Sequence, residues 1–325
     1  MNDFSAMMIL SSIIAAACPI IFAAIGETIT EKSGVINLSL DGTILLSAMT
    51  AFVISYSTGS VFLGFFMASL VGGFVALIVV FFSIYLRVSQ VAVGFVLTLT
   101  CRDLAYFIGN PYSRLLGPQV QPLPIPFLSD LPFIGTAFFS HNVVVYVCYI
   151  FFFFSWFYIE KTPMGHILKA VGEHPHAAYS RGIHPHRIQL IYGFVGGVFV
   201  GIAGASYSLF MKAGWGRPQG CEGIGWIALA LVIFGGWNIS RVVIGCYLFS
   251  FLQVMGIFFQ QWFPTFPSPV FQVAPFPLMI FSLVIIHVSQ NDKIREWSKD
   301  KNVILFFLNR FSHSAPAHLG KRFHV

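Results

Sequence analysis

Residues 61–86 read VFLGFFMASLVGGFVALIVVFFSIYL, a run of 26 residues without a charged side chain. A helix needs about 20 apolar residues to cross about 30 Å of hydrocarbon, and one charge at its centre costs roughly 2.5–3.5 kcal/mol. Four further runs are as long as a span requires and uncharged, and three more are shorter or contain one acid but are still adequate. They are 4–26, 188–211, 242–263 and 270–289, followed by the weaker 142–159, 223–240 and 35–57. The sequence therefore predicts eight membrane-spanning helices.

The overall composition agrees with this pattern. The chain of 325 residues is 57% hydrophobic and 9% charged, whereas soluble domains carry about 25% charged residues. Too few charges are present to cover a water-facing surface, so we expect an all-α, polytopic transmembrane helix bundle. The net charge of +6 does not indicate a nucleic-acid partner, because the basic residues form no patch.

One stretch does not fit a simple span. Residues 88–101 are uncharged but too few to cross the membrane, and they continue into Arg102 and Asp103. We interpret this stretch as a broken or re-entrant helix, which brings the expected total to about eight or nine spans. Irregular backbone at membrane depth is tolerated where it lines a cavity or is buried in protein. The alternative is an ordinary helix in which Arg102 and Asp103 neutralise one another.

The distribution of lysine and arginine predicts the orientation. If the links at Lys32, Arg87 and Arg241, the loop 160–187 and the tail after His287 are cytoplasmic, 14 of the 18 basic residues lie inside. The N-terminus is then outside and the C-terminus inside. We expect a transmembrane domain over residues 1–290, followed by a basic cytoplasmic tail, 291–325, that lies on the anionic inner leaflet.

Two segments outside the membrane differ in composition. Residues 110–141 contain six of the 17 prolines, which favours a rigid, extended extracytoplasmic connection. The cytoplasmic loop 160–187 contains helix-forming residues, and we expect a short helix at the membrane face that stops at Gly182.

Small residues recur every four positions in the run 188–211, at Gly193, Gly197, Gly201 and Ala205. This spacing lets two membrane helices approach closely. We therefore expect this helix inside the bundle or at a subunit contact, rather than attributing its glycines to the general frequency of glycine in membrane helices.

Polar residues inside membrane segments are functional candidates, because burying them is costly. Asn37 and Asp41 lie four residues apart and share one face of the second helix if that helix is regular. They line a pathway, or else Asp41 pairs structurally with a base such as Arg102. Our candidates for lining a translocation pathway are Glu27, Asn37, Asp41, Arg102 and Asp103.

Motifs for chemistry are absent from the sequence. No GxxxxGK[ST] phosphate-binding loop, GxSxG or HExxH occurs, so nucleotide hydrolysis or other catalysis by this chain is not expected. Five of the ten histidines cluster in the loop 160–187, at His166, His174, His176, His184 and His186. Two HxH pairs could ligate a metal, but no cysteine or aspartate joins them, so we favour a solvated loop without metal.

Two motifs carry a family resemblance. The stretch GETITEKSGVINLSLDG (26–42) resembles the signature GE…ERSGVxNLxxEG of membrane permeases in ABC importers of the branched-chain amino acid, simple sugar and nucleoside type. The stretch TPMGHILKAVGEHPHAAYSRGIHPHR (162–187) resembles the cytoplasmic segment of the same family. Both occur in the family's order and separation. The similarity covers roughly residues 15–290 and includes IAGASYSL (202–209), FGGW (234–237) and PFPLMIFSLVII (275–286).

The resemblance implies that the loop 160–187 docks into a separate ATPase subunit. The matching positions are Gly165, Lys169, Gly172, Glu173, Ala177, Ala178, Gly182 and Arg187, with Lys169 standing where arginine is usual. Further partners implied are a second permease subunit, identical or different, and an extracytoplasmic solute-binding protein. The chain itself is expected in the inner membrane and needs no cofactor, since ATP is used by the ATPase.

Within this family, the resemblance favours nucleoside and purine permeases, with simple sugar or riboflavin permeases as alternatives. Two other classes remain open. An ion-driven secondary transporter would need buried acids, and only Asp41 and Asp103 are placed to serve. A membrane scaffold that transports nothing would tolerate the loss of the loop 160–187.

Overall fold

A computed structural model shows an all-α bundle, as the sequence predicts. It describes residues 6–262, except 130, 132–134 and 213, together with 277, 280, 284, 315–321 and 323. Seven helices in this part of the chain are long and apolar enough to cross a membrane. They are α1 (Ala6–Lys32), α2 (Leu40–Thr58), α3 (Val61–Ile84), α4 (Gln90–Gly109), α5 (Val143–Lys161), α8 (Pro185–Ser206) and α10 (Ile239–Trp262). The predicted span 270–289 lies outside the described residues.

The break predicted at 88–101 is wrong. α4 continues without interruption through Arg102 and Asp103 to Gly109. Arg102 Nε donates to Asp103 Oδ1 over 3.2 Å, so the two charges neutralise one another in a regular helix, which was the alternative interpretation.

The incomplete helix is α9 (Ile224–Phe234), which occupies the predicted span 223–240. It has 11 residues and is therefore about 16 Å long at 1.5 Å per residue. This length is too short to cross the hydrocarbon layer alone. The segment between α8 and α9 must consequently enter the bundle from one end to reach the first residue of α9.

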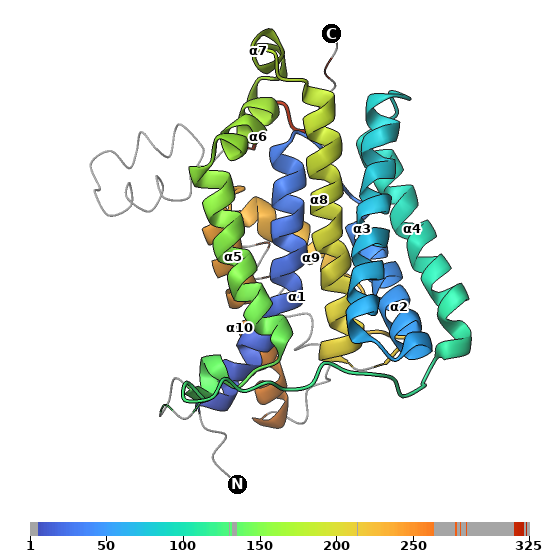
Figure 1. Cartoon of the computed structure of the whole chain (residues 1–325), viewed down its shortest axis with the longest axis vertical. Coiled ribbons are helices and arrows are strands. Elements are labelled where there is room, and N and C mark those ends of the chain that lie inside the picture. Colours follow the sequence, from blue (N-terminus) through green and yellow to red (C-terminus); the bar gives the residue numbers. More distant parts are fainter. Residues whose placement is uncertain are drawn as a thin grey trace.

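α8 lies between α1 and α3 (Figure 1), and its small residues explain this position. A Cβ on Gly201 would lie 2.3 Å from the Ala68 carbonyl oxygen of α3, and one on Gly197 would lie 2.5 Å from that of Gly72. The two helix backbones approach so closely that only glycine fits at these positions. The prediction that this helix packs inside the bundle is confirmed.

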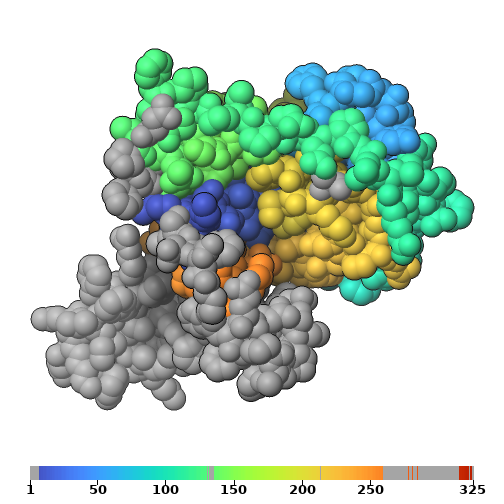
Figure 2. Space-filling model, turned by 90° about the horizontal axis from the view of Figure 1, so that it is seen from below, coloured from blue at the N-terminus to red at the C-terminus, as the bar shows by residue number. Residues whose placement is uncertain are grey.

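The two segments outside the long helices cap opposite ends of the bundle (Figure 1). α6 (Pro163–Glu173) and α7 (Pro175–Ser180) lie at one end, which we call the α6–α7 end. The proline-rich segment crosses the opposite end and contains two short turns, η1 (Asn110–Tyr112) and η2 (Gly135–Phe139). Figure 2 shows that end, where this green segment borders the yellow region after α8 and its last turn η3 (Tyr207–Met211). Val120 N–H donates to the Leu209 carbonyl oxygen there, over 3.0 Å.

Candidate translocation site and coupling face

The link between α1 and α2, residues 33–39, enters the interior of the bundle beside α4. Ile36 N–H donates to Gln90 Oε1 (2.8 Å), and the Leu38 carbonyl oxygen accepts from Thr98 Oγ1 (2.6 Å). Gln90 and Thr98 are separated by eight residues of α4, or about 12 Å. The link therefore descends well inside the bundle before α2 begins at Leu40.

This descent brings Asn37 to Glu27 of α1. Glu27 Oε1 accepts from Asn37 N–H over 3.1 Å, and the two residues are 0% and 1% exposed. Within the described part of the chain, Glu27 Oε2 and Asn37 Nδ2 have no hydrogen-bond partner. A buried polar group left unpaired costs about 1–3 kcal/mol, so these two atoms lack the partners that burial normally requires. Because Asn37 precedes α2, the expectation that it shares a helical face with Asp41 is wrong.

Asp41 connects the first turn of α2 to the first turn of α9. Its Oδ1 accepts from Gly225 N–H over 3.1 Å. A Cβ on Gly225 would lie 2.2 Å from Asp41 N, so this junction requires glycine. The N-terminal ends of both helices meet at one carboxylate, where their dipoles favour a negative charge. Discontinuous helices that meet inside the bundle form the solute site in many transporters.

Arg102 and Asp103 occupy a different place. Asp41 accepts from the α9 backbone, and Arg102 pairs with Asp103 instead, so the proposed ion pair of Asp41 with Arg102 is wrong. The Arg102 and Asp103 side chains are 43% and 72% exposed, on the least buried of the seven long helices. No described hydrogen bond joins them to Glu27 or Asn37. The candidate residues thus form a buried group, Glu27, Asn37 and Asp41, and an ion-paired couple on α4 whose side chains are partly exposed.

Sequence reasoning missed two polar residues of the interior. Trp237 Nε1, in the turn after α9, donates to the Glu31 carboxylate. Glu31 follows Glu27 by four residues, so both carboxyl groups lie on one face of α1, and that spacing could have identified it. Gln90 uses both ends of its amide, because its Nε2 also donates to Ser83 Oγ over 2.8 Å. Nothing in its sequence neighbourhood indicated this role.

A second polar cluster, also missed, lies in the segment before α9. Glu222 accepts from the Tyr106 hydroxyl and from the N–H groups of Gln219 (2.7 Å) and Gly220 (2.6 Å). Burial opposes ionisation of Glu222, but these hydrogen bonds outweigh burial and hold its pKa below the ordinary value. The Arg217 guanidinium lies 4.8 Å from the centre of the Tyr106 ring. This cluster fixes the entering segment against α4.

The loop 160–187 forms two helices instead of the single one expected. Thr162 caps α6 by accepting from Gly165 N–H over 3.2 Å. Pro175 separates α6 from α7, since proline has no N–H to donate and restricts the preceding residue. α7 ends just before Gly182, whose φ of +82° is left-handed. The predicted glycine stop is confirmed.

The eight matching positions of this loop divide into two groups. A Cβ on Gly165 would lie 2.4 Å from the Tyr158 carbonyl oxygen, and one on Gly172 would lie 2.2 Å from that of Lys32. These glycines, with the buried Ala178 and the 2.6 Å ion pair of Lys169 with Glu160, hold the helices on the bundle. The other four positions, Glu173, Ala177, Gly182 and Arg187, are exposed.

The loop histidines do not form a cluster of metal-binding geometry within the described chain. His166, His174, His176 and His184 are exposed, and His186 is half-buried.

Comparison with known proteins gives one family. The family model of the branched-chain amino acid transport system / permease component matches residues 9–286. A putative glucose ABC transporter permease protein of Haloferax volcanii, TsgC13, is 34% identical over 76% of both chains. The guanosine ABC transporter permease protein NupQ of Bacillus subtilis is 29% identical over 82% of this chain and 88% of its own. The nucleoside ABC transporter permease protein NupC of Lactococcus lactis is 25% identical over 86% and 91%. No solved structure matches the chain.

Proposed function

The chain belongs to the branched-chain amino acid transport system / permease component family, and from this premise we propose that it forms the pathway through which an ABC importer moves a nucleoside or purine. It is a multi-pass membrane protein and a transport subunit, not an enzyme. The family implies an ATPase and a solute-binding protein as partners.

The meeting of α2 and α9 at Asp41 is the observation that carries the proposed pathway. Two incomplete elements, the link 33–39 and α9, end inside the bundle at this carboxylate. Nearby, Glu27 of α1 and Asn37 of the link offer an unpaired acceptor and an unpaired donor. A nucleoside presents hydroxyl and amino groups that donate to carboxylates and ring atoms that accept from amides. These residues therefore suit a neutral, polar solute.

The outer side of α4 supports a second permease subunit. Arg102 and Asp103 are exposed near the middle of a spanning helix, and charged groups at membrane depth normally face protein or a water-filled cavity. A partner permease, or an aqueous path shared with it, would keep this pair away from lipid.

The exposed part of α7 supports docking of the ATPase. Ala177 and Gly182 lie on the surface, and a Cβ on Gly182 would meet no atom within 4 Å. Small residues there leave room for a closely fitting partner. ATP would bind to that partner, whose movement would rock the helices around the central site.

The relatives favour two solute classes. NupQ and NupC are named for guanosine and nucleosides, whereas TsgC13 is named for glucose. A simple sugar is therefore the second candidate. Nucleosides and simple sugars both carry several hydroxyl groups, which can donate hydrogen bonds to the carboxylates of Glu27 and Asp41.

The test is uptake into proteoliposomes that hold the complete importer. Labelled guanosine, adenosine and glucose would each be offered with and without ATP on the side of the ATPase. We expect ATP-dependent uptake of a nucleoside that excess glucose does not inhibit. Preferential glucose uptake would select the second candidate, and uptake that persists without ATP would overturn the importer assignment.

Variants of α7 test the coupling role. Gly182→Trp adds bulk but also strains a left-handed residue, so Ala177→Trp, in a regular helix, supplies the same bulk without that strain. We expect both variants to abolish ATP-dependent uptake. The matched control is Leu116→Trp, at the opposite end of the bundle and 89% exposed, which should transport normally. Full-rate uptake by Ala177→Trp would contradict docking at this face.

A further inference from the structure

The C-terminal residues 315–321 and 323, here called the C-terminal segment, pack on the α6–α7 end of the bundle. His318 N–H donates to the Gly172 carbonyl oxygen of α6, and Gly320 N–H donates to the Gly34 carbonyl oxygen in the α1–α2 link, each over 3.0 Å. The segment therefore joins two elements that are far apart in sequence. These residues contact protein, and the expectation that the tail lies on the anionic inner leaflet stays a prediction.

A side chain strengthens the contact with α6. Glu173 Oε2 accepts from Ala317 N–H over 3.0 Å. A carboxylate that accepts a backbone N–H forms a stronger hydrogen bond than a neutral group does. Glu173 is one of the positions that match the family's coupling loop, and here its carboxylate binds the C-terminal segment.

Phe323 anchors the segment to α7 and α8. The side chain is 8% exposed, and its ring centre lies 4.7 Å from that of His176, 5.8 Å from that of Tyr179 and 5.4 Å from that of His186. Aromatic rings at these separations attract one another beyond the area they bury. The rings of His176 and His186 thus both pack against the Phe323 ring.

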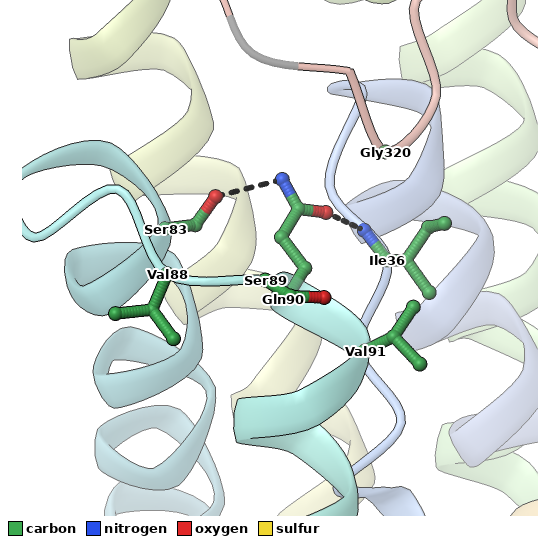
Figure 3. A pocket seen from close by; sticks show the side chains of 7 residues that line it. All are labelled: Ile36, Ser83, Val88, Ser89, Gln90, Val91 and Gly320. Carbon is green, nitrogen blue, oxygen red and sulfur yellow. Dashed lines mark hydrogen bonds between the residues drawn. The ribbon is translucent and has the colours of Figure 1, made fainter.

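Gly320, three residues before Phe323, reaches the link that leads to the candidate site. Figure 3 shows Gly320 above Ile36, whose N–H donates to Gln90 Oε1. Both residues line a cavity of about 120 Å³. A Cβ on Gly320 would lie 2.7 Å from Ile36 Cδ1. Ile36 directly precedes Asn37, the residue bound to Glu27. A continuous series of contacts therefore runs from α7 to the buried polar pair.

The C-terminal segment leaves uncovered the exposed surface formed by Ala177 of α7 and by Arg181 and Gly182, which follow it. Among the described contacts, none joins it to Ala177, Arg181 or Gly182, and all three residues are exposed. A partner could therefore dock on this surface while the segment stays in place.

We propose that the C-terminal segment is a strut that transmits ATPase-driven movement of α6 and α7 to the α1–α2 link. The proposal rests on the proposed function, since it needs an ATPase at α7 and a pathway at Asn37. Coupling between two sites requires a physical connection with different free energies in the two states. The backbone hydrogen bonds at Gly172 and Gly34, with Phe323 as anchor, form that connection.

Releasing the strut is the first test. Phe323→Ala removes the anchor, whereas Phe323→Tyr keeps a ring as the matched control. In the importer reconstituted with its ATPase, we expect the amount of solute moved per ATP hydrolysed to fall about five-fold or more in Phe323→Ala. ATP hydrolysis should continue, and Phe323→Tyr should behave as wild type. An unchanged transport ratio in Phe323→Ala would overturn the strut.

Locking the segment in place is the second test. Cysteines replacing Ala170 and Ala317, both exposed, would be joined by a short bis-maleimide that leaves the Glu173 contact intact, with each single cysteine variant as control. A strut stays in place throughout the cycle, so the locked importer should keep its ATP-driven uptake. Loss of uptake on locking would show instead that the segment must leave for the ATPase to work, and would overturn the proposal.

The two levels of proposal fail differently. If wild type shows no ATP-driven uptake, the proposed function fails. If wild type transports and the variants behave contrary to expectation, only the strut fails.

Discussion

The indole N–H of Trp237 donates a hydrogen bond to the carboxylate of Glu31, which joins the turn after α9 to the last turn of α1. Both residues are buried, at 8% and 4% exposed. The contact ties α9, which meets Asp41 at its other end, to the same helix that carries Glu27. The incomplete helix is thereby held at both of its ends.

Trp237→Phe keeps an aromatic ring but removes the donor. Since the buried Glu31 carboxylate would lose this partner, we expect a loss of about 1–3 kcal/mol in stability. The measurement is the thermal midpoint of the detergent-solubilised protein. Trp226→Phe, at a residue of α9 that is 38% exposed, serves as control and should melt near wild type. Equal midpoints for the two variants would argue against the contact.

Asp41→Asn should separate folding from transport. The amide oxygen can still accept from Gly225 N–H, so the junction of α2 and α9 is preserved. The loss of a charged acceptor for solute weakens a hydrogen bond of about 1.5–3 kcal/mol, or about ten-fold in uptake at low solute concentration. The control Ser57→Ala changes an exposed hydroxyl in the last turn of the same helix, and should not alter uptake. Normal uptake by Asp41→Asn would remove Asp41 from the pathway.

Gly201→Ala tests the close packing of α8 on α3. The added Cβ would lie 2.3 Å from the Ala68 carbonyl oxygen, so the helices must separate. Overpacking of this kind costs about 1–3 kcal/mol, measurable as a lower thermal midpoint. Gly216→Ala is the control, because its nearest atom is Ser113 Oγ at 3.7 Å. The packing account is wrong if Gly201→Ala is as stable as that control.

Docking of the C-terminal segment should weaken in acid. Burial, followed by the charges of His176 and Lys321, lowers the pKa of His318 below its ordinary value of 6.5. A lowered pKa in the docked state means that docking favours the neutral imidazole. The contribution of His318 to docking is therefore fully present above pH 6.5 and is lost as the pH falls below it.

Spin labels on cysteines at Ala170 and Ala317, which leave the Glu173 contact intact, would measure this change as a distance that broadens in acid. His318→Gln, which cannot titrate, should reduce the broadening. A distance that is independent of pH in the otherwise unchanged chain would contradict the role of His318.

The sequence by itself determined the class of protein. Runs such as 61–86 require helices in lipid, because hydrocarbon offers no hydrogen-bond partners to the backbone. The four-residue repeat of glycines predicted the packing of α8, since side-chain spacing along a helix fixes which residues share a face. The motifs at 26–42 and 162–187 identified the family, because each is one short continuous segment that can be recognised without knowing the fold.

Only the tertiary structure decided how the interior is arranged. Asp41 and Gly225 are 184 residues apart, and no local pattern predicts that their backbones touch. Hydropathy treats Arg102 and Asp103 as an interruption, although their mutual ion pair lets α4 continue. The hydrogen bond from His318 N–H to the Gly172 carbonyl oxygen likewise joins residues that are far apart in the sequence. Such contacts are set by the shape of the packed bundle, where burial of polar groups is permitted only if distant residues supply their partners.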